Sequence, residues 1–191
     1  GFVPKLINID KNLSHNYIRP FLWNIKLGIS LPGQIFMINK QYFFKNLPEI
    51  DTVYDDLMIG AVVREYNLPI YFVKDVLGYE RPKGNILLLI KQRIRWAKGL
   101  AETIIFNRKN KVLPYILLHA FSFNLLWVPI YILIYYCIRM NILCGIFIIL
   151  SIAYALTDNK IKDIFWSFMY MIIFPFIYII WGIALLVNLI G

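Results

Sequence analysis

Hydrophobic and polar positions are distributed unevenly along the chain. Up to about Tyr79 they are mixed, and short runs rich in β-forming residues occur at Gln34 to Ile38 and at Ile70 to Val73. Between these runs, residues from Asp55 to Tyr66 follow a helical period. Strand-like runs around a helix are typical of an α/β fold, so we interpret residues 1–84 as part of an α/β domain.

The next segment, residues 85–112, has a different pattern. From Asn85 to Phe106 apolar residues recur with a helical period, and four basic residues occupy other positions of the same helix: Lys91, Arg93, Arg95 and Lys98. A helix that lies in the membrane interface has this pattern, and a soluble amphipathic helix has it too. The apolar segments that follow favour the interface.

The last segment, residues 113–191, holds three stretches that are nearly free of charge, at 114–138, 140–156 and 164–190. A transmembrane helix needs about 20 apolar residues. We therefore predict about three transmembrane helices. Because the middle stretch is short, a re-entrant hairpin formed by the first two is the structural alternative.

Basic residues around these stretches predict an orientation. Arg108, Lys109 and Lys111 precede the first stretch, whereas only Arg139 separates the first from the second, and Lys160 and Lys162 precede the third. Cytoplasmic flanks carry the excess of Lys and Arg. We expect an integral protein of the plasma membrane, with residues 1–84 in the cytoplasm and Gly191 outside.

Composition supports the lipid bilayer as a partner. Hydrophobic residues make up 60% of the 191 residues and charged residues only 16%, which is too apolar for an ordinary soluble domain. The chain has a net charge of +9, and basic residues are concentrated just before the apolar stretches, where they would lie next to anionic lipid head groups. We therefore do not expect nucleic acid as a partner. Cys137 and Cys144 lack the neighbouring ligands of a metal site. Gly1 to Asp10 has no signal-peptide pattern, and we expect the chain to begin within a longer protein.

Two clusters of residues could carry chemistry. Asp55 and Asp56 are adjacent acids at the start of the predicted helix, where a helix cap and a favourable interaction with the helix dipole would also explain them. The second cluster is the run from Gln92 to Trp96, Gln-Arg-Ile-Arg-Trp, on the basic helix.

Residues of the second cluster share one helical face. Gln92 and Trp96 are four positions apart, and Arg95 lies three positions from Gln92. A guanidinium group matches two phosphate oxygens, an indole provides a plate for stacking a sugar ring, and an amide can bind hydroxyls. A basic interface helix with a Trp at head-group depth is the alternative explanation.

Taken together, the two clusters resemble the processive family 2 glycosyltransferases, such as cellulose, chitin, hyaluronan and poly-N-acetylglucosamine synthases. That family has a Glu-Asp pair, then a Gln-x-x-Arg-Trp motif on an interface helix, then transmembrane helices. The resemblance covers Leu31 to the C-terminus. The run from Pro32 to Ile38 looks like the small-residue turn and strand that line the acceptor side, and Gly33 belongs to that turn. The implied fold is the C-terminal part of a GT-A-like α/β catalytic domain, followed by the interface helix and the transmembrane helices.

Two departures from the family pattern limit what the resemblance implies. The acid pair is Asp-Asp instead of Glu-Asp, and the chain has no Asp-x-Asp spacing. The family uses such a motif to hold the Mg²⁺ or Mn²⁺ that binds the nucleotide diphosphate. The resemblance thus implies a metal cofactor whose ligands lie before Gly1, and we expect the 191 residues alone to be inactive.

The resemblance implies an inverting transfer of a sugar from a nucleotide-diphosphate sugar to a growing glycan or a lipid acceptor. In this mechanism Asp56 is the general base and Asp55 orients it. Arg95, together with Arg93, stabilises the leaving diphosphate. Gln92 and Trp96 position the acceptor sugar. The alternative hypothesis is a non-catalytic membrane-anchoring or pore-forming subunit that binds lipid head groups through the basic helix.

Overall fold

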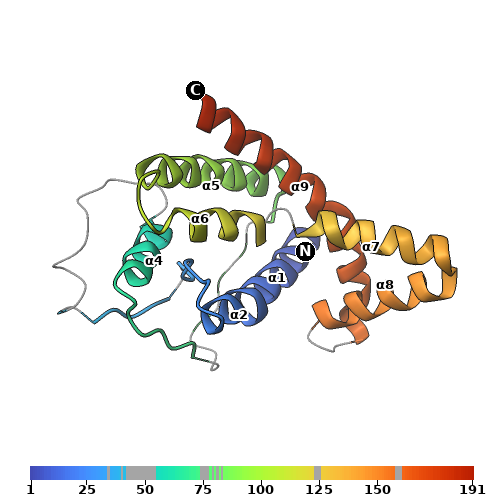
Figure 1. Ribbon diagram of the computed structural model, residues 1–191. Coiled ribbons are helices and arrows are strands. Elements are labelled where there is room, and N and C mark those ends of the chain that lie inside the picture. Colours follow the sequence, from blue (N-terminus) through green and yellow to red (C-terminus); the bar gives the residue numbers. More distant parts are fainter. Residues whose placement is uncertain are drawn as a thin grey trace.

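Figure 1 shows the computed structural model of the chain. The structure describes residues 1–33, 35–39, 41, 55–73, 78, 80, 82, 84–122, 126–157 and 161–191. All regular secondary structure in these residues is helical, and they contain no β-strand. The predicted α/β fold class is therefore wrong.

The two predicted strands show why. Ile70 to Val73 has the alternating exposure of a strand, with Tyr71 and Val73 exposed and Ile70 and Phe72 partly buried, yet its backbone is irregular. A strand needs a neighbour to pair its N–H and C=O groups, and no neighbouring strand occurs in the described ranges. Residues 35–38 are irregular as well, and Gln34 lies outside the described residues.

The N-terminal segment is helical where we expected α/β structure. Helix α1 (Phe2–Asn12) continues into a π-helix, η1 (Leu13–Ile18), and then into α2 (Arg19–Asn24). Helix α1 buries Val3, Leu6, Ile7 and Asp10, which are spaced by three and four residues along one face. Helix α2 ends in a Schellman motif with Lys26 in the left-handed conformation (φ 59°).

Both helices predicted from periodicity in the first half of the chain are confirmed. Helix α4 (Asp55–Glu65) ends in a second Schellman motif, with Asn67 at φ 49°. Helix α5 (Ile86–Phe106) begins at Asn85, whose side chain accepts a hydrogen bond of 2.8 Å from the backbone N–H of Leu87.

Within the predicted first membrane span the structure describes two helices, α6 (Leu113–Ala120) and α7 (Trp127–Met140). Residues 121–122 are helical as well, and residues 123–125 lie outside the described residues. Helix α8 (Ile142–Leu156) follows and forms a hairpin with α7, and a short 3₁₀ turn, η3 (Ile161–Asp163), leads into α9 (Ile164–Ile190). The hairpin projects to one side of α9, as Figure 1 shows.

Of the helices in the described ranges, only α9 is long and apolar enough to span a membrane. Its 27 residues extend about 40 Å, whereas the 14 residues of α7 and the 15 of α8 reach only about 21 and 22 Å, which is less than the roughly 30 Å hydrocarbon core. Both the three-span arrangement and the re-entrant hairpin stay predictions.

Helix α9 organises the packing. Its buried residues lie along one stripe against α1, α5 and α8, and they are Ser167, Tyr170, Met171, Phe174, Ile177, Tyr178 and Trp181. Its other faces are apolar but exposed, as at Ile172, Phe176 and Ile179. An exposed apolar surface of this extent fits a helix surrounded by lipid.

Candidate functional site

The two helices that carry the candidate motifs pack in one core. Leu57 and Ala61 of α4 belong to the same buried cluster as Ala97 and Leu100 of α5, and Ile29 joins them from the preceding loop. Leu57 directly follows Asp56, and Ala97 directly follows Trp96. The packing therefore brings the acid pair and the Gln-Arg-Ile-Arg-Trp run onto neighbouring helices, although they are about forty residues apart in sequence.

A close backbone approach holds α4 against the loop before it. A methyl carbon added at Gly60 would lie 1.7 Å from the carbonyl oxygen of Ile29. No side chain fits at this position, so the loop that leads to Gly33 can rest directly on α4. On the other side of α4, the amide of Asn107 lies 3.5 Å from the sulfur of Met58, which adds a polar contact next to the end of α5.

The same loop brings Gly33 to the candidate base. A methyl carbon at Gly33 would lie 2.7 Å from Oδ2 of Asp56, closer than non-bonded carbon and oxygen atoms can approach. The partly buried carboxylate of Asp56 thus lies against the chain at a position without a side chain. The side chain of Asp55 is outside the described residues, so its predicted role stays a prediction.

The four candidate residues on α5 differ in exposure. Arg95 is exposed, Gln92 and Trp96 are partly buried, and Arg93 is buried, with 8% of its surface exposed. The sequence placed Gln92, Arg95 and Trp96 on one face. Arg93 faces the protein core instead, where α5 packs on α9.

Arg93 takes part in a buried polar cluster that the sequence did not reveal. Its Nη2 donates a hydrogen bond of 2.5 Å to Oδ2 of Asp10 in α1. The other carboxylate oxygen of Asp10 accepts hydrogen bonds from the hydroxyls of Tyr170, at 2.9 Å, and Tyr178, both in α9. Asp10 lies on the buried stripe of α1, and an acid among apolar residues at helical spacing is the one sequence feature that could have pointed to it.

Electrostatics stabilise this pair. Burial by itself would lower the pKa of the Arg93 guanidinium, but the charge of the Asp10 carboxylate and its hydrogen bond, together with Tyr178 and Tyr170, raise the pKa above its ordinary value. Arg93 therefore carries its charge inside the protein. The guanidinium also lies 4.4 Å from the ring centroid of Trp96 and 5.9 Å from that of Phe174, which are cation–π distances.

The described residues do not provide a site for the expected metal ion. Among them no group of three or more His, Cys, Asp or Glu side chains is arranged to hold a cation. Asp56 offers one described carboxylate at the candidate site, and Mg²⁺ at a nucleotide is usually held by one or two carboxylates together with phosphate oxygens and water. The metal ligands that the resemblance implies before Gly1 stay a prediction, and the mechanism below has no step through a metal ion.

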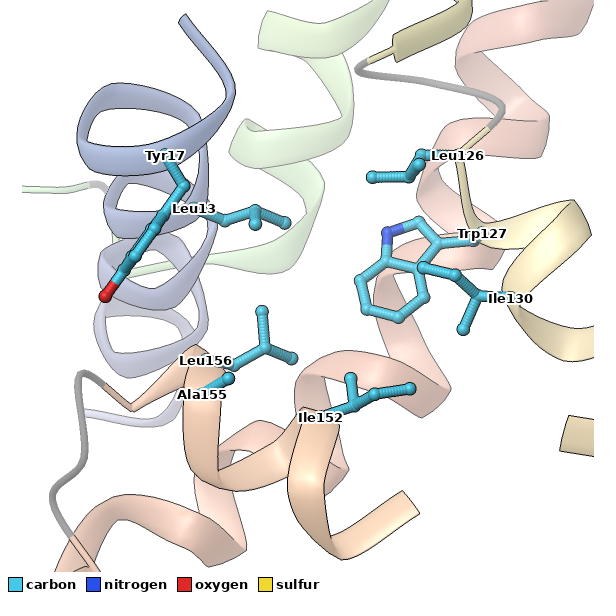
Figure 2. A pocket seen from close by; sticks show the side chains of 8 residues that line it. All are labelled: Leu13, Tyr17, Leu126, Trp127, Ile130, Ile152, Ala155 and Leu156. Carbon is cyan, nitrogen blue, oxygen red and sulfur yellow. The ribbon is translucent and has the colours of Figure 1, made fainter. Parts of the chain in front are cut away.

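An apolar pocket of about 270 Å³ lies away from the two motifs, between η1 and the α7–α8 hairpin. Figure 2 shows Leu13 and Tyr17 on one side and Trp127 and Ile130 on the other, and its further lining residues are Leu126, Ile152, Ala155 and Leu156. This lining has no carboxylate, imidazole or thiol. Its one hydroxyl belongs to Tyr17, and we keep the motif residues of α4 and α5 as the candidate site.

The candidate residues are one carboxylate on α4, Asp56, and one exposed guanidinium, one amide and one indole on α5, from Arg95, Gln92 and Trp96. A carboxylate can accept a proton from a hydroxyl, and a guanidinium can bind a phosphate group. Comparison of the chain with protein-family models, curated proteins and solved structures found no match.

Proposed function

We propose that the chain is part of a membrane-bound inverting glycosyltransferase, which moves a sugar from a nucleotide-diphosphate sugar to a glycan or lipid acceptor. One observation carries the proposal. The helix that begins with the acid pair and the helix with the Gln-Arg-Ile-Arg-Trp run share a buried core, and Gly33 lies at the carboxylate of Asp56. This packing supports the proposal because the two helices that carry the motifs of the resemblance are neighbours in the fold.

Asp56 is the general base of the proposed reaction. Its carboxylate takes the proton of the acceptor hydroxyl while that oxygen attacks the anomeric carbon and the bond to the diphosphate breaks. Such a base must lie within hydrogen-bond reach of the hydroxyl. Because Gly33 has no side chain, the acceptor-side loop can approach the carboxylate closely.

Arg95 stabilises the charge that develops on the leaving diphosphate. Its guanidinium is exposed on α5 and can form a two-point contact with phosphate oxygens. Arg93 was expected to share this task, but its guanidinium is bonded to Asp10 in the core. We therefore assign the diphosphate to Arg95 alone, and Gln92 and Trp96 to the acceptor sugar.

In the proposed arrangement α9 crosses the plasma membrane, α5 lies at the cytoplasmic interface, and the acid pair faces the cytoplasm. The length and apolar surface of α9 support the membrane location. The basic residues before residue 114 support the cytoplasmic side.

One observation favours the non-catalytic alternative, a subunit that anchors a complex to the membrane. Lys91, Arg95 and Lys98 are all exposed on α5 and follow each other at spacings of four and three, which forms a basic stripe. Such a stripe attracts anionic lipid head groups. The two functions make opposite predictions for substitutions in the stripe.

The test compares Arg95→Lys with Lys98→Arg in the full-length gene product, by measuring sugar transfer in membranes that hold equal amounts of protein. An ammonium group cannot reproduce the planar two-point contact, so we expect Arg95→Lys to lower turnover about tenfold or more. Lys98→Arg, which also keeps the charge, is the matched control and should leave transfer unchanged.

Trp96→Ala completes the comparison. The loss of the stacking plate should raise the acceptor KM while the protein stays membrane-bound. Under the anchoring alternative, Arg95→Lys leaves membrane attachment unchanged, because it keeps the charge, and Trp96→Ala weakens membrane attachment. Normal sugar transfer by both Arg95→Lys and Trp96→Ala would contradict the interpretation of α5 as part of an active site.

A further inference from the structure

We propose that Asp10 is a positioning residue for the acceptor site: it holds Arg93 against the ring of Trp96 and so fixes the orientation of the indole on which the acceptor sugar stacks. This inference rests on the proposed function. It assigns a role in the reaction to a residue of α1, which lies outside both motifs.

The first step is the bond between Asp10 and Arg93. Both side chains are about 10% exposed, and the distance between Nη2 and Oδ2 is 2.5 Å. A buried guanidinium without its carboxylate would be costly, so the carboxylate determines where the guanidinium lies. Among the described residues, Nε of Arg93 has no hydrogen-bond partner, which leaves Asp10 as the anchor of the group.

The second step is the pair of hydrogen bonds between Asp10 and the long helix α9. The hydroxyls of Tyr170 and Tyr178 donate to Oδ1 of Asp10, while Arg93 donates to Oδ2. Three donors from two helices thus converge on one carboxylate. An Asn at position 10 offers a single carbonyl oxygen and an NH₂ group, so it cannot accept from all three donors in this way.

The third step leads from Arg93 to Trp96. The guanidinium carbon lies 4.4 Å from the centre of the indole ring, and Arg93 and Trp96 are three positions apart on α5. A desolvated cation at this distance is attracted to the ring face. Trp96 is only partly buried. The buried Arg93 guanidinium therefore contacts the indole ring from the protein side. The exposed part of the Trp96 side chain remains available to stack on a sugar.

The test is a double-mutant cycle on acceptor KM with Asp10→Asn, Trp96→Ala and the double variant, in membranes that hold the full-length protein. If Asp10 acts through Trp96, Asp10→Asn raises the acceptor KM about tenfold, on the scale of a desolvated cation–π contact, and adds nothing once Trp96 is Ala. Donor KM should stay unchanged. Additive effects in the double variant would overturn the proposal.

Two further variants separate positioning from folding. Asp10→Asn leaves a buried charge without its partner, so the paired variant Asp10→Asn with Arg93→Gln provides a neutral hydrogen-bonding pair. It should keep the protein folded and still raise the acceptor KM, because the cation beside Trp96 is gone. Lys11→Gln is the control, since it removes the neighbouring, more exposed ion pair with Glu80 and should change nothing.

A readout without activity distinguishes this inference from the proposed function. We expect both Asp10 variants to shift the tryptophan emission of the purified protein, and we expect most of the shift to vanish in a Trp96→Phe background. If the emission shifts but Trp96→Ala leaves the acceptor KM unchanged, the acceptor role proposed for Trp96 is contradicted, and with it this inference. A raised acceptor KM for Trp96→Ala, with neither emission nor KM altered by the paired variant, would contradict the role of Asp10 alone.

Discussion

At the scale of single residues, the candidate site depends on a glycine as much as on its acid. Gly33 has no positive φ, so its backbone conformation is open to any residue. Its role is therefore spatial: a side chain at this position would meet Oδ2 of Asp56 at 2.7 Å. The carboxylate is a flexible group and can move away, but a displaced base no longer lies where the reaction needs it.

We therefore predict that Gly33→Ala lowers turnover about tenfold while the protein remains as stable as the wild type, because small misplacements of a catalytic group are costly. The assay is sugar transfer at saturating donor and acceptor, together with a thermal unfolding curve in detergent. Gly84→Ala is the matched control, since nothing lies within 4 Å of a methyl carbon there. Unchanged transfer by Gly33→Ala would mean that the position of Asp56 is not important for the reaction.

The sequence shows the candidate motif residues but not the partners that side chains meet in the fold. Asp56, Gln92, Arg95 and Trp96 lie in short runs that can be read locally. The partners of Asp10 are 83, 160 and 168 positions away along the chain. Nothing in the local pattern indicates which of the apolar and aromatic positions of α9 will meet an acid of α1, so the role of Arg93 in the core could not be predicted.

At the scale of elements, helical periods were reliable wherever they were used. The periods from Asp55 to Tyr66 and from Asn85 to Phe106 agree with α4 and α5. Helix α1 was missed although Val3, Leu6 and Ile7 follow the same rule. The predicted strands failed because β-forming residues show only that an extended conformation is favourable, whereas a strand also needs a neighbour, which local sequence does not reveal.

The packing of α4 on its preceding loop leads to a prediction on stability. In an exposed helix Gly→Ala normally stabilises by up to about 1 kcal/mol. We predict the opposite for Gly60→Ala, a loss of roughly 1–3 kcal/mol, because the methyl group would meet a backbone carbonyl that cannot turn away. Thermal unfolding of the purified variants in detergent measures this change.

Gly182→Ala in α9 is the control, because a methyl carbon there has no atom within 4 Å. It should be neutral or slightly stabilising. A Gly60→Ala variant as stable as Gly182→Ala would mean that α4 does not rest on the loop at Ile29, and the link between Gly33 and Asp56 would lose its structural basis.

At the scale of the whole molecule, the helix that is long and apolar enough to span a membrane, α9, packs on α5, which carries the Gln-Arg-Ile-Arg-Trp run. Helix α9 also packs against α1, and its tyrosines bind Asp10, which in turn holds Arg93 beside Trp96. Apolar stretches in the sequence predicted a membrane location for residues 113–191, and among the described helices α9 is long and apolar enough to span a membrane. Hydropathy measures only how apolar a segment is and does not show where a helix ends, so the sequence predicted one span where α6 and α7 are described as separate helices.

The central claim is that Asp56 is the base of a sugar transfer, and one measurement tests it most directly. Membranes with the full-length gene product receive a panel of radiolabelled nucleotide-diphosphate sugars, divalent cations and acceptor, and incorporation is compared between wild type and Asp56→Asn at equal protein amounts. Because a general base contributes about 10² to 10⁴ in rate, we predict that the wild type transfers one of these sugars and that Asp56→Asn lowers turnover about a hundredfold or more, with donor KM unchanged. Near-normal turnover of Asp56→Asn at saturating donor, or no incorporation by the wild type with any donor, would contradict the account.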